Sequence, residues 1–143
     1  MPRTIDSLLL QYRENHANPT NELIHFVCVP AIVFALLGLL WSIHPLLTLA
    51  TSAAALYYYY KLSKPFAAGM LLMALVMLGL LLLSPPEIVL PLSLGIFVLA
   101  WIGQFIGHKI EGKKPSFFDD VRFLLIGPLF VLSFLYRRLR ISY

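Results

Sequence analysis

Three histidines and one glutamate stand in two short polar clusters, at the two ends of a long and mostly apolar stretch of the sequence. His16 and His25 are in the first cluster, and His108 and Glu111 are in the second. The spacing of three between His108 and Glu111 places both side chains on one face of a helix. Imidazole binds iron, zinc, copper and nickel, and two histidines with one carboxylate are typical of non-haem Fe(II) oxygenases. We therefore interpret these four residues as candidate ligands of one metal site.

Other polar residues near the clusters are candidates for supporting roles, because groups that hydrogen-bond a ligand imidazole fix its orientation. The candidates are Asn18, Asn21, Gln104, Asp119 and Asp120. Gln104 lies one helical turn before His108 and faces the same way, although it could equally bond a neighbouring helix. The two aspartates could instead supply the negative charge that favours the N-terminus of the last helix.

Glu111 also has an alternative to metal ligation. Lys113 and Lys114 follow it closely in the sequence. A rim carboxylate paired with one of these lysines would be a surface ion pair, and the metal would then depend on the histidines and other groups.

The composition indicates that the two clusters belong to a membrane protein. The 143 residues suffice for one domain, and 59% are hydrophobic but only 13% are charged. Soluble domains carry about 25% charged residues, so this sequence could not build a water-facing surface. The basic residues form small groups beside apolar runs, as on the cytoplasmic side of a bilayer. We predict one integral membrane domain over residues 1–143, in contact with lipid and not with nucleic acid.

The hydrophobic pattern predicts an all-α protein with four transmembrane helices. Residues 23–60 contain no Asp, Glu, Lys or Arg. At about 20 residues per crossing, this run fits two helices with a turn near His44. Residues 65–86 and 88–107 are two further uncharged runs, and each fits one more crossing.

Two shorter segments flank the predicted crossings. Ile5, Leu8, Leu9 and Tyr12 recur at helical spacing, which predicts an amphipathic N-terminal helix on the membrane surface. Residues 123–136 are uncharged over a run too short for a full crossing, and they are predicted to form a half-inserted C-terminal helix.

The number of crossings determines on which side of the membrane each histidine lies. With four crossings, His108 returns to the side that holds His16 and His25, and the charge bias makes this side cytoplasmic. His44 stands at the opposite turn, about 30 Å away across the hydrocarbon core, and cannot join the same site.

The two clusters, in this order around an apolar hairpin, resemble the membrane 2-hydroxy fatty acid dioxygenases. The resemblance covers nearly the whole chain. The segments that carry it are Tyr12-x3-His16-x4-Asn21-x3-His25, then Gln104-Phe105-Ile106-Gly107-His108-x2-Glu111-x3-Pro115, and finally Phe118-Asp119-Asp120-x2-Phe123-Leu124.

The resemblance implies an Fe(II) enzyme of fatty acid α-oxidation, which uses O2 to convert a long-chain 2-hydroxy fatty acid to the acid one carbon shorter. The family's motif histidines match His16, His25 and His108, and the carboxylate ligand is left open among Glu111, Asp119 and Asp120. The substrate's carboxylate would be held electrostatically by one nearby lysine, and its acyl tail would lie between the apolar helices. The candidate lysines are Lys109, Lys113 and Lys114. The expected location is the cytoplasmic membrane in a bacterium or the endoplasmic reticulum in a eukaryote.

Two other classes of function use the same residues differently. A zinc-dependent membrane lipid hydrolase would activate water at these histidines. A non-catalytic membrane protein would use them only as polar caps of helices at the membrane surface.

Overall fold

The computed structural model describes residues 3–118 and 120–143, and in this part of the chain all regular secondary structure is helical. The all-α class predicted from the hydrophobic pattern is confirmed. In chain order the helices are α1 (Thr4–Glu14), α2 (Pro19–Ile43), α3 (Pro45–Leu62), α4 (Lys64–Leu83), α5 (Pro86–Glu111), the short 3-10 helix η1 (Ser116–Phe118) and α6 (Phe123–Arg138).

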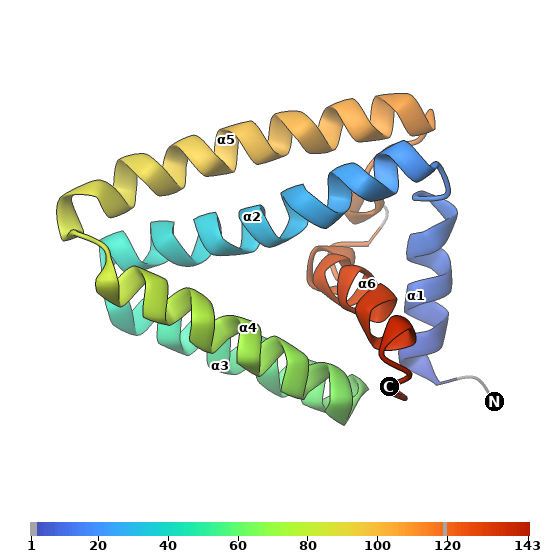
Figure 1. Cartoon of the computed structure of the whole chain (residues 1–143), viewed down its shortest axis with the longest axis horizontal. Helices are drawn as coiled ribbons and strands as arrows, with labels where there is room; N and C mark the ends of the chain where they lie inside the picture. The colour runs from blue at the N-terminus through green and yellow to red at the C-terminus, as the bar shows by residue number, and fades with distance from the viewer. Residues whose placement is uncertain (1–2, 119) are drawn as a thin grey trace.

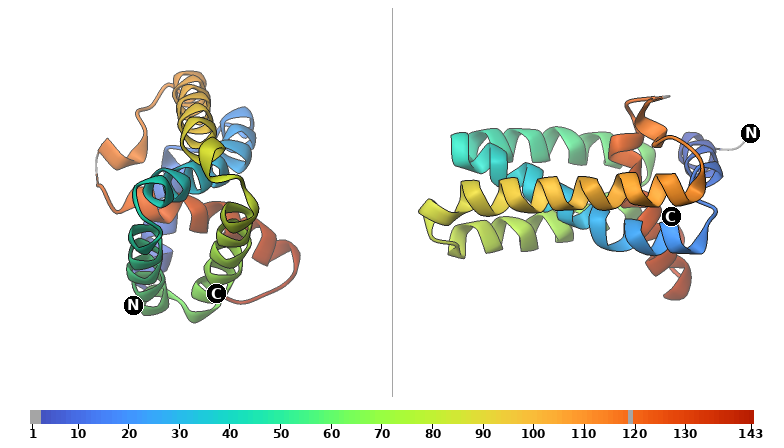
Figure 2. Two further views of the ribbon diagram at one scale, coloured as in Figure 1. Left: turned by 90° about the vertical axis from the view of Figure 1, so that its left-hand side faces the viewer. Right: turned by 90° about the horizontal axis from the view of Figure 1, so that it is seen from above.

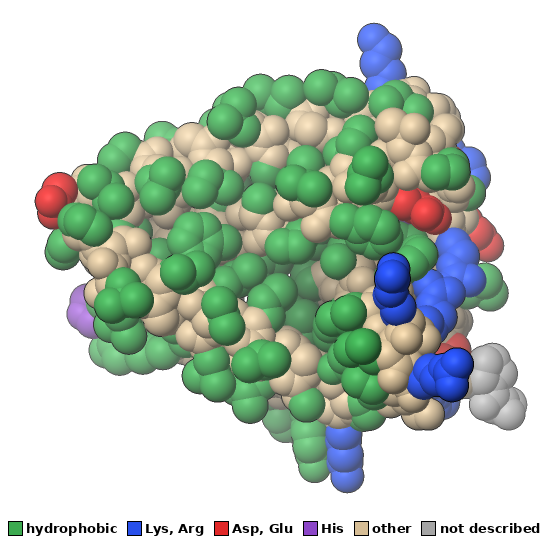
Figure 3. Space-filling view, in the orientation of Figure 1, with side chains coloured by type: hydrophobic (Ala, Val, Ile, Leu, Met, Phe, Trp, Pro, Cys, Tyr) green, Lys and Arg blue, Asp and Glu red, His purple; other side chains and the backbone are tan. Residues whose placement is uncertain are grey.

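The four long helices, α2 to α5, run alternately in opposite directions along the length of the molecule (Figure 1). α1 and α6 lie at one end of this bundle, where α6 crosses the direction of the long helices (Figure 2). Most of the charged side chains visible in Figure 3 gather at this same end, whereas hydrophobic side chains cover the long helices. The molecule therefore has an apolar body and one polar end.

Proline and polar caps determine where the long helices begin. Proline is favoured in the first turn because its φ angle suits the helix and its missing N–H has no partner there. Such prolines are Pro19, Pro45, Pro65 and Pro86. His44 is exposed at the turn between α2 and α3, where its Nδ1 accepts a hydrogen bond from the N–H of Leu46 at 3.1 Å. It is a helix cap at the end remote from the other histidines, as expected.

α1 is the predicted amphipathic helix, but its apolar face is covered by protein. Ile5, Leu8, Leu9 and Tyr12 are all buried, in one hydrophobic cluster with residues of α6, α3 and α4. The sequence predicted that this apolar face would lie on the membrane surface, but the face packs against other helices of the protein instead. A helical period identifies an apolar face, but it does not say whether lipid or another helix covers it.

α6 is fastened across the ends of α3 and α4 by two tyrosines. The hydroxyl of Tyr59 on α3 donates to the carbonyl oxygen of Leu125 at 2.8 Å. The hydroxyl of Tyr136 on α6 donates to the carbonyl oxygen of Pro65 at 2.5 Å. These bonds fix the lateral position of α6 beneath the polar end of the bundle.

Three helices, α2, α4 and α5, are long and apolar enough to cross a membrane, which supports a membrane-associated protein. α3 does not meet the same criterion, because its 18 residues include Thr, Ser and four consecutive tyrosines. α6, at 16 residues, is also shorter than a full crossing needs. Three of the four predicted crossings are thus supported by length and composition, and the fourth stays a prediction.

α2 and α5 pack closely through small residues. A Cβ added to Gly38 of α2 would collide with the side chain of Ser93 on α5, and one added to Gly103 would lie 2.7 Å from Cys28 Sγ. Small residues of this kind let two helix backbones approach each other in a membrane. α5 continues past the predicted apolar run to Glu111, where Gly112 ends it in a left-handed conformation. Close packing and this extra turn bring the second polar cluster beside the start of α2.

The Gly38 contact gives a direct test of the α2–α5 packing. We expect Gly38→Leu to lower the free energy of unfolding by about 1–3 kcal/mol, because an overpacked interface must move apart. Thermal or denaturant unfolding in detergent micelles measures this change. Gly79→Leu is the matched control, since a Cβ at Gly79 meets no atom within 4 Å. Equal stability of the two variants would contradict the described packing.

Candidate metal centre

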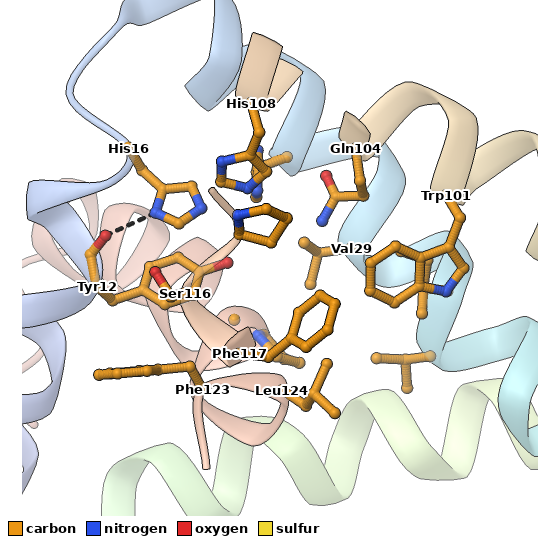
Figure 4. Close-up of a pocket in the computed structure, with 16 residues that line it drawn as sticks. Tyr12, His16, Val29, Trp101, Gln104, His108, Ser116, Phe117, Phe123 and Leu124 are labelled. Carbon is orange, nitrogen blue, oxygen red and sulfur yellow. Dashed lines mark hydrogen bonds between the residues drawn. The ribbon is translucent and has the colours of Figure 1, made fainter. Parts of the chain in front are cut away.

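Three of the four predicted ligands converge at the polar end of the bundle. Two of them, His16 and His108, are labelled in Figure 4. His16 lies in the loop between α1 and α2, His25 lies on α2, and His108 lies in the last turns of α5. All three are buried, and their ring centroids are 4.2 to 4.9 Å apart. One nitrogen from each ring can be chosen so that all three lie within 4.8 Å of one another.

Backbone carbonyls orient two of the imidazoles. His16 Nδ1 lies 2.6 Å from the carbonyl oxygen of Tyr12, and His25 Nδ1 lies 2.9 Å from that of Asn21. A carbonyl only accepts, so each Nδ1 must carry the proton and donate it. The lone pair of each ring is then on Nε2, which is the arrangement that metal-ligating histidines commonly have.

One nitrogen of each ring is buried without a hydrogen-bond partner among the described residues. They are His16 Nε2, His25 Nε2 and His108 Nδ1. Buried polar atoms in folded proteins are rarely left unsatisfied, so three of them facing one small space need an explanation. A bound transition-metal ion satisfies all three at once, and neutral imidazole nitrogens suit iron, zinc, copper or nickel. The donor set therefore fits a metal.

His16 is also held in the neutral form that a metal ligand requires. Burial lowers the pKa of His16 to about 3, and repulsion from His25 adds to the effect. The ring of Tyr12 stacks on the ring of His16, with centroids 4.0 Å apart and planes inclined by 3°. Tyr12 is a supporting residue that the metal-ligand reasoning missed, although it is part of the first motif and lies four positions before His16.

Glu111 lies beside the three histidines but outside the group that could share one ion. Its Oε1 accepts hydrogen bonds from the backbone N–H of Asn18 at 2.9 Å and from Asn21 Nδ2 at 3.1 Å. These bonds join the end of α5 to the first turn of α2. Because the carbonyl of Asn21 orients His25, Glu111 is connected to the histidine group through Asn21. Metal ligation by Glu111 stays a prediction.

The other predicted supporting residues have different surroundings. Asn18 caps α2, with its side chain accepting from the N–H of Thr20 at 2.9 Å. Gln104 is buried, its Oε1 has no partner within the described residues, and its amide extends into the space beside His108 (Figure 4). Asp120 forms an ion pair with Arg122 at 2.7 Å just before α6. α6 begins at Phe123 without an acidic residue in its first turn, so the helix-terminal role of Asp120 stays a prediction. Asp119 lies outside the described residues.

The predicted lysines stand on the rim. Lys109 and Lys114 are exposed, and Lys113 Nζ donates to the carbonyl oxygen of Glu14 at the end of α1, at 2.8 Å. None of the three lines the pocket at the histidines. Contact between a rim lysine and a substrate carboxylate stays a prediction.

A pocket of about 50 Å³ opens beside the three histidines. Apolar and aromatic side chains dominate its walls, including four rings that come from α1, α5, η1 and the start of α6. These rings belong to Tyr12, Trp101, Phe117 and Phe123. Sequence spacing alone did not indicate Phe117, because nothing in a local pattern says which loop aromatic will cover a site built by other helices.

Substitutions at Glu111 separate its two candidate roles. Glu111→Gln keeps a carbonyl acceptor for the Asn18 N–H, so we expect bound metal per chain to be unchanged. Glu111→Ala removes both hydrogen bonds, and we expect it to lower the free energy of unfolding by about 2 kcal/mol. Metal analysis and unfolding in detergent measure the two effects, with Glu22→Gln as the control carboxylate. Loss of metal from Glu111→Gln would instead show that the carboxylate is a ligand.

The chain matches a known protein family over almost its whole length. The family model described as 2-hydroxy-palmitic acid dioxygenase Mpo1-like matches residues 3–139. Over 136 residues the chain is 31% identical to the 2-hydroxy-palmitic acid dioxygenase MPO1 of Saccharomyces cerevisiae. The matched region covers 88% of this chain and 76% of the yeast protein. No solved structure matches significantly. The matched region contains all three clustered histidines. The resemblance seen in the motifs is therefore confirmed, and the chain belongs to the Mpo1-like family of 2-hydroxy-palmitic acid dioxygenases.

Proposed function

We propose that this protein is an Fe(II)-dependent dioxygenase that converts long-chain 2-hydroxy fatty acids to the acid one carbon shorter. The observation that carries the proposal is the group of three buried histidines, each with a ring nitrogen free for a metal, at the head of an apolar pocket. The family of the chain adds the substrate class, because the yeast relative is described as acting on 2-hydroxy-palmitic acid.

His16, His25 and His108 are the proposed ligands. Ferrous iron, when bound, supplies open coordination positions and the redox chemistry that lets O2 react with an organic acid. The reaction balances with one O2 for each 2-hydroxy acid, and it gives the shortened acid, CO2 and water. The hydrogen bonds from His16 and His25 to backbone carbonyls fix both rings in the tautomer that leaves Nε2 free.

The chain's own residues also position the substrate and keep water away. Gln104 offers an unpartnered side-chain oxygen, Oε1, beside His108, and this oxygen can accept a hydrogen bond from the 2-hydroxyl of the acid. The aromatic walls exclude water, which strengthens these polar contacts. Lys109 and Lys113 lie on the rim, and we propose that they attract the carboxylate electrostatically before it reaches the histidines.

We also propose that α3 crosses the membrane with α2, α4 and α5. α2 and α4 run in the same direction along the bundle (Figure 1). If both α2 and α4 cross the membrane, the chain between them has to return across the same thickness, and α3 is the segment available to do so. The histidine group and most of the basic residues would then share one side, which the bias of Lys and Arg makes the cytoplasmic side. The membrane would be the cytoplasmic membrane in a bacterium or the endoplasmic reticulum in a eukaryote.

Metal content and substrate turnover test the function together. We expect purified protein to hold iron and to consume 2-hydroxypalmitate only with O2, yielding pentadecanoate. His16→Ala and His108→Ala should each lower iron content and turnover by at least about tenfold, since each removes a ligand. His44→Ala is the matched control, because His44 caps a helix at the remote end. Iron retained with full turnover in His16→Ala would contradict the assignment, and O2-independent hydrolysis of a lipid with zinc would favour the hydrolase.

Thiol labelling tests the proposed crossing of α3. In a Cys28→Ala background, single cysteines replace His44 or Lys114, both of which are exposed. A membrane-impermeant thiol reagent applied to sealed vesicles should label the two positions from opposite sides. Labelling of both from one side would contradict the four-crossing arrangement.

A further inference from the structure

A second and larger cavity lies behind the pocket at the histidines, deeper in the bundle. It has a volume of about 320 Å³ and is enclosed by residues of α2, α3, α4, α5 and α6. Five residues line both this cavity and the pocket, so the two spaces share a wall. They are Ile32, Val33, Trp101, Leu124 and Pro128. The hollow between the long helices can be followed in Figure 3, where hydrophobic side chains surround it.

The cavity is lined by uncharged residues that offer few polar atoms. Its lining residues with polar side-chain atoms are Thr51, Ser52, Tyr59 and Trp101. The hydroxyl of Tyr59 already donates to the carbonyl oxygen of Leu125, and Trp101 Nε1 is buried without a partner among the described residues. A cavity of this kind does not hold ordered water well, because a water molecule needs several polar partners. An apolar ligand fits it better.

We propose that this cavity holds the acyl chain of the substrate and that its far wall limits the length of that chain. The proposal rests on the proposed function, because it takes carbons 1 and 2 of the acid to lie at the histidines. From His108 back to Phe97, at the far part of the α5 wall, the helix rises about 16 Å. This depth suits a long acyl chain, whereas a short acid would leave much of the cavity empty.

Continuity with the pocket selects this occupant over a loose bilayer lipid. The wall shared with the pocket includes the ring of Trp101, which packs at 5.3 Å on Phe117 beside the histidines. A chain that enters the cavity past Trp101 therefore has its polar head at Gln104 and His108. A phospholipid would bring two acyl chains and a large headgroup to this point, where the pocket has a volume of only about 50 Å³.

Two small residues leave room in the cavity. Ala55 on α3 and Ala74 on α4 both line it, and each helix also carries an alanine that is exposed, Ala54 and Ala68 respectively. At the far end, Met77 of α4 is buried against Leu37 of α2 and limits the depth of the space. Larger side chains at the alanines should shorten the accepted chain, and a smaller one at Met77 should lengthen it.

Cavity-filling variants test the proposal on the iron-loaded protein. We expect Ala55→Trp and Ala74→Trp to lower kcat/KM for 2-hydroxypalmitate by at least about tenfold, because each displaced methylene loses about fourfold in binding. Turnover of 2-hydroxyoctanoate should stay within about twofold of the wild type, since its shorter chain does not reach the filled region. Met77→Ala should shift the preference toward longer acids. The matched controls are Ala54→Trp and Ala68→Trp, on the exposed faces of the same helices.

Anaerobic binding of 2-hydroxypalmitate, followed by native mass spectrometry, gives a readout without turnover. We expect the wild type and both controls to bind it, and the two cavity-filling variants to bind only the shorter acid. An unchanged chain-length profile in all three cavity variants, with iron retained, would overturn the inference, as would a phospholipid retained in the cavity instead of the acid. Binding without turnover by the wild type would contradict the proposed function and leave the acyl cavity supported.

Discussion

The close antiparallel pairing of α2 with α5 is the constraint on which the site depends. His25 and His108 come from these two helices, and their rings meet only if the backbones approach closely at the polar end. Gly107 permits this approach, because a Cβ there would collide with the side chain of Asn21. Glu111 then fixes the longitudinal position of the pair by accepting bonds from the first turn of α2. A shift of either helix along the other by one turn, about 5 Å, would separate the two imidazoles.

Burial of the three imidazoles has a cost that the surrounding residues only partly offset. Two rings donate to backbone carbonyls, but one nitrogen of each of the three rings keeps no partner within the described chain. An unsatisfied buried nitrogen is destabilising by about 1–3 kcal/mol. A metal that binds the folded chain in preference to the unfolded chain therefore stabilises the fold as well as the site. The packing of α1 and α6 around His16 keeps water away from the buried ring nitrogens. Water therefore cannot take the place of a metal as their partner.

The sequence alone could predict which histidines meet, because the number of apolar runs decides the side on which each polar cluster emerges. That argument grouped His16, His25 and His108 and left His44 apart, in agreement with the structure. It could not predict the partner of a particular carboxylate. Glu111 bonds the start of α2, which lies far away in sequence, and Asp120 bonds Arg122, which is nearly adjacent. Which partner each carboxylate has depends on distances of a few ångströms. Helix packing sets these distances, and the hydrophobic periodicity of the sequence does not contain them.

If the proposed function holds, the position of the histidines at one end of the bundle would place the polar reaction beside an apolar space for the acyl chain. Under the proposed function, the carboxylate of the substrate would lie at the polar end, near the charged residues of the rim, while α1, η1 and α6 cover the histidines with aromatic rings. The apolar body behind them offers the surroundings in which an acyl chain is stable. A site at mid-depth would leave the carboxylate buried in the hydrocarbon region, and a site outside the bundle would leave the chain in water. At the boundary between the polar end and the apolar body, the carboxylate of the proposed substrate can meet polar groups while its acyl chain stays among apolar side chains. His108 lies at this boundary.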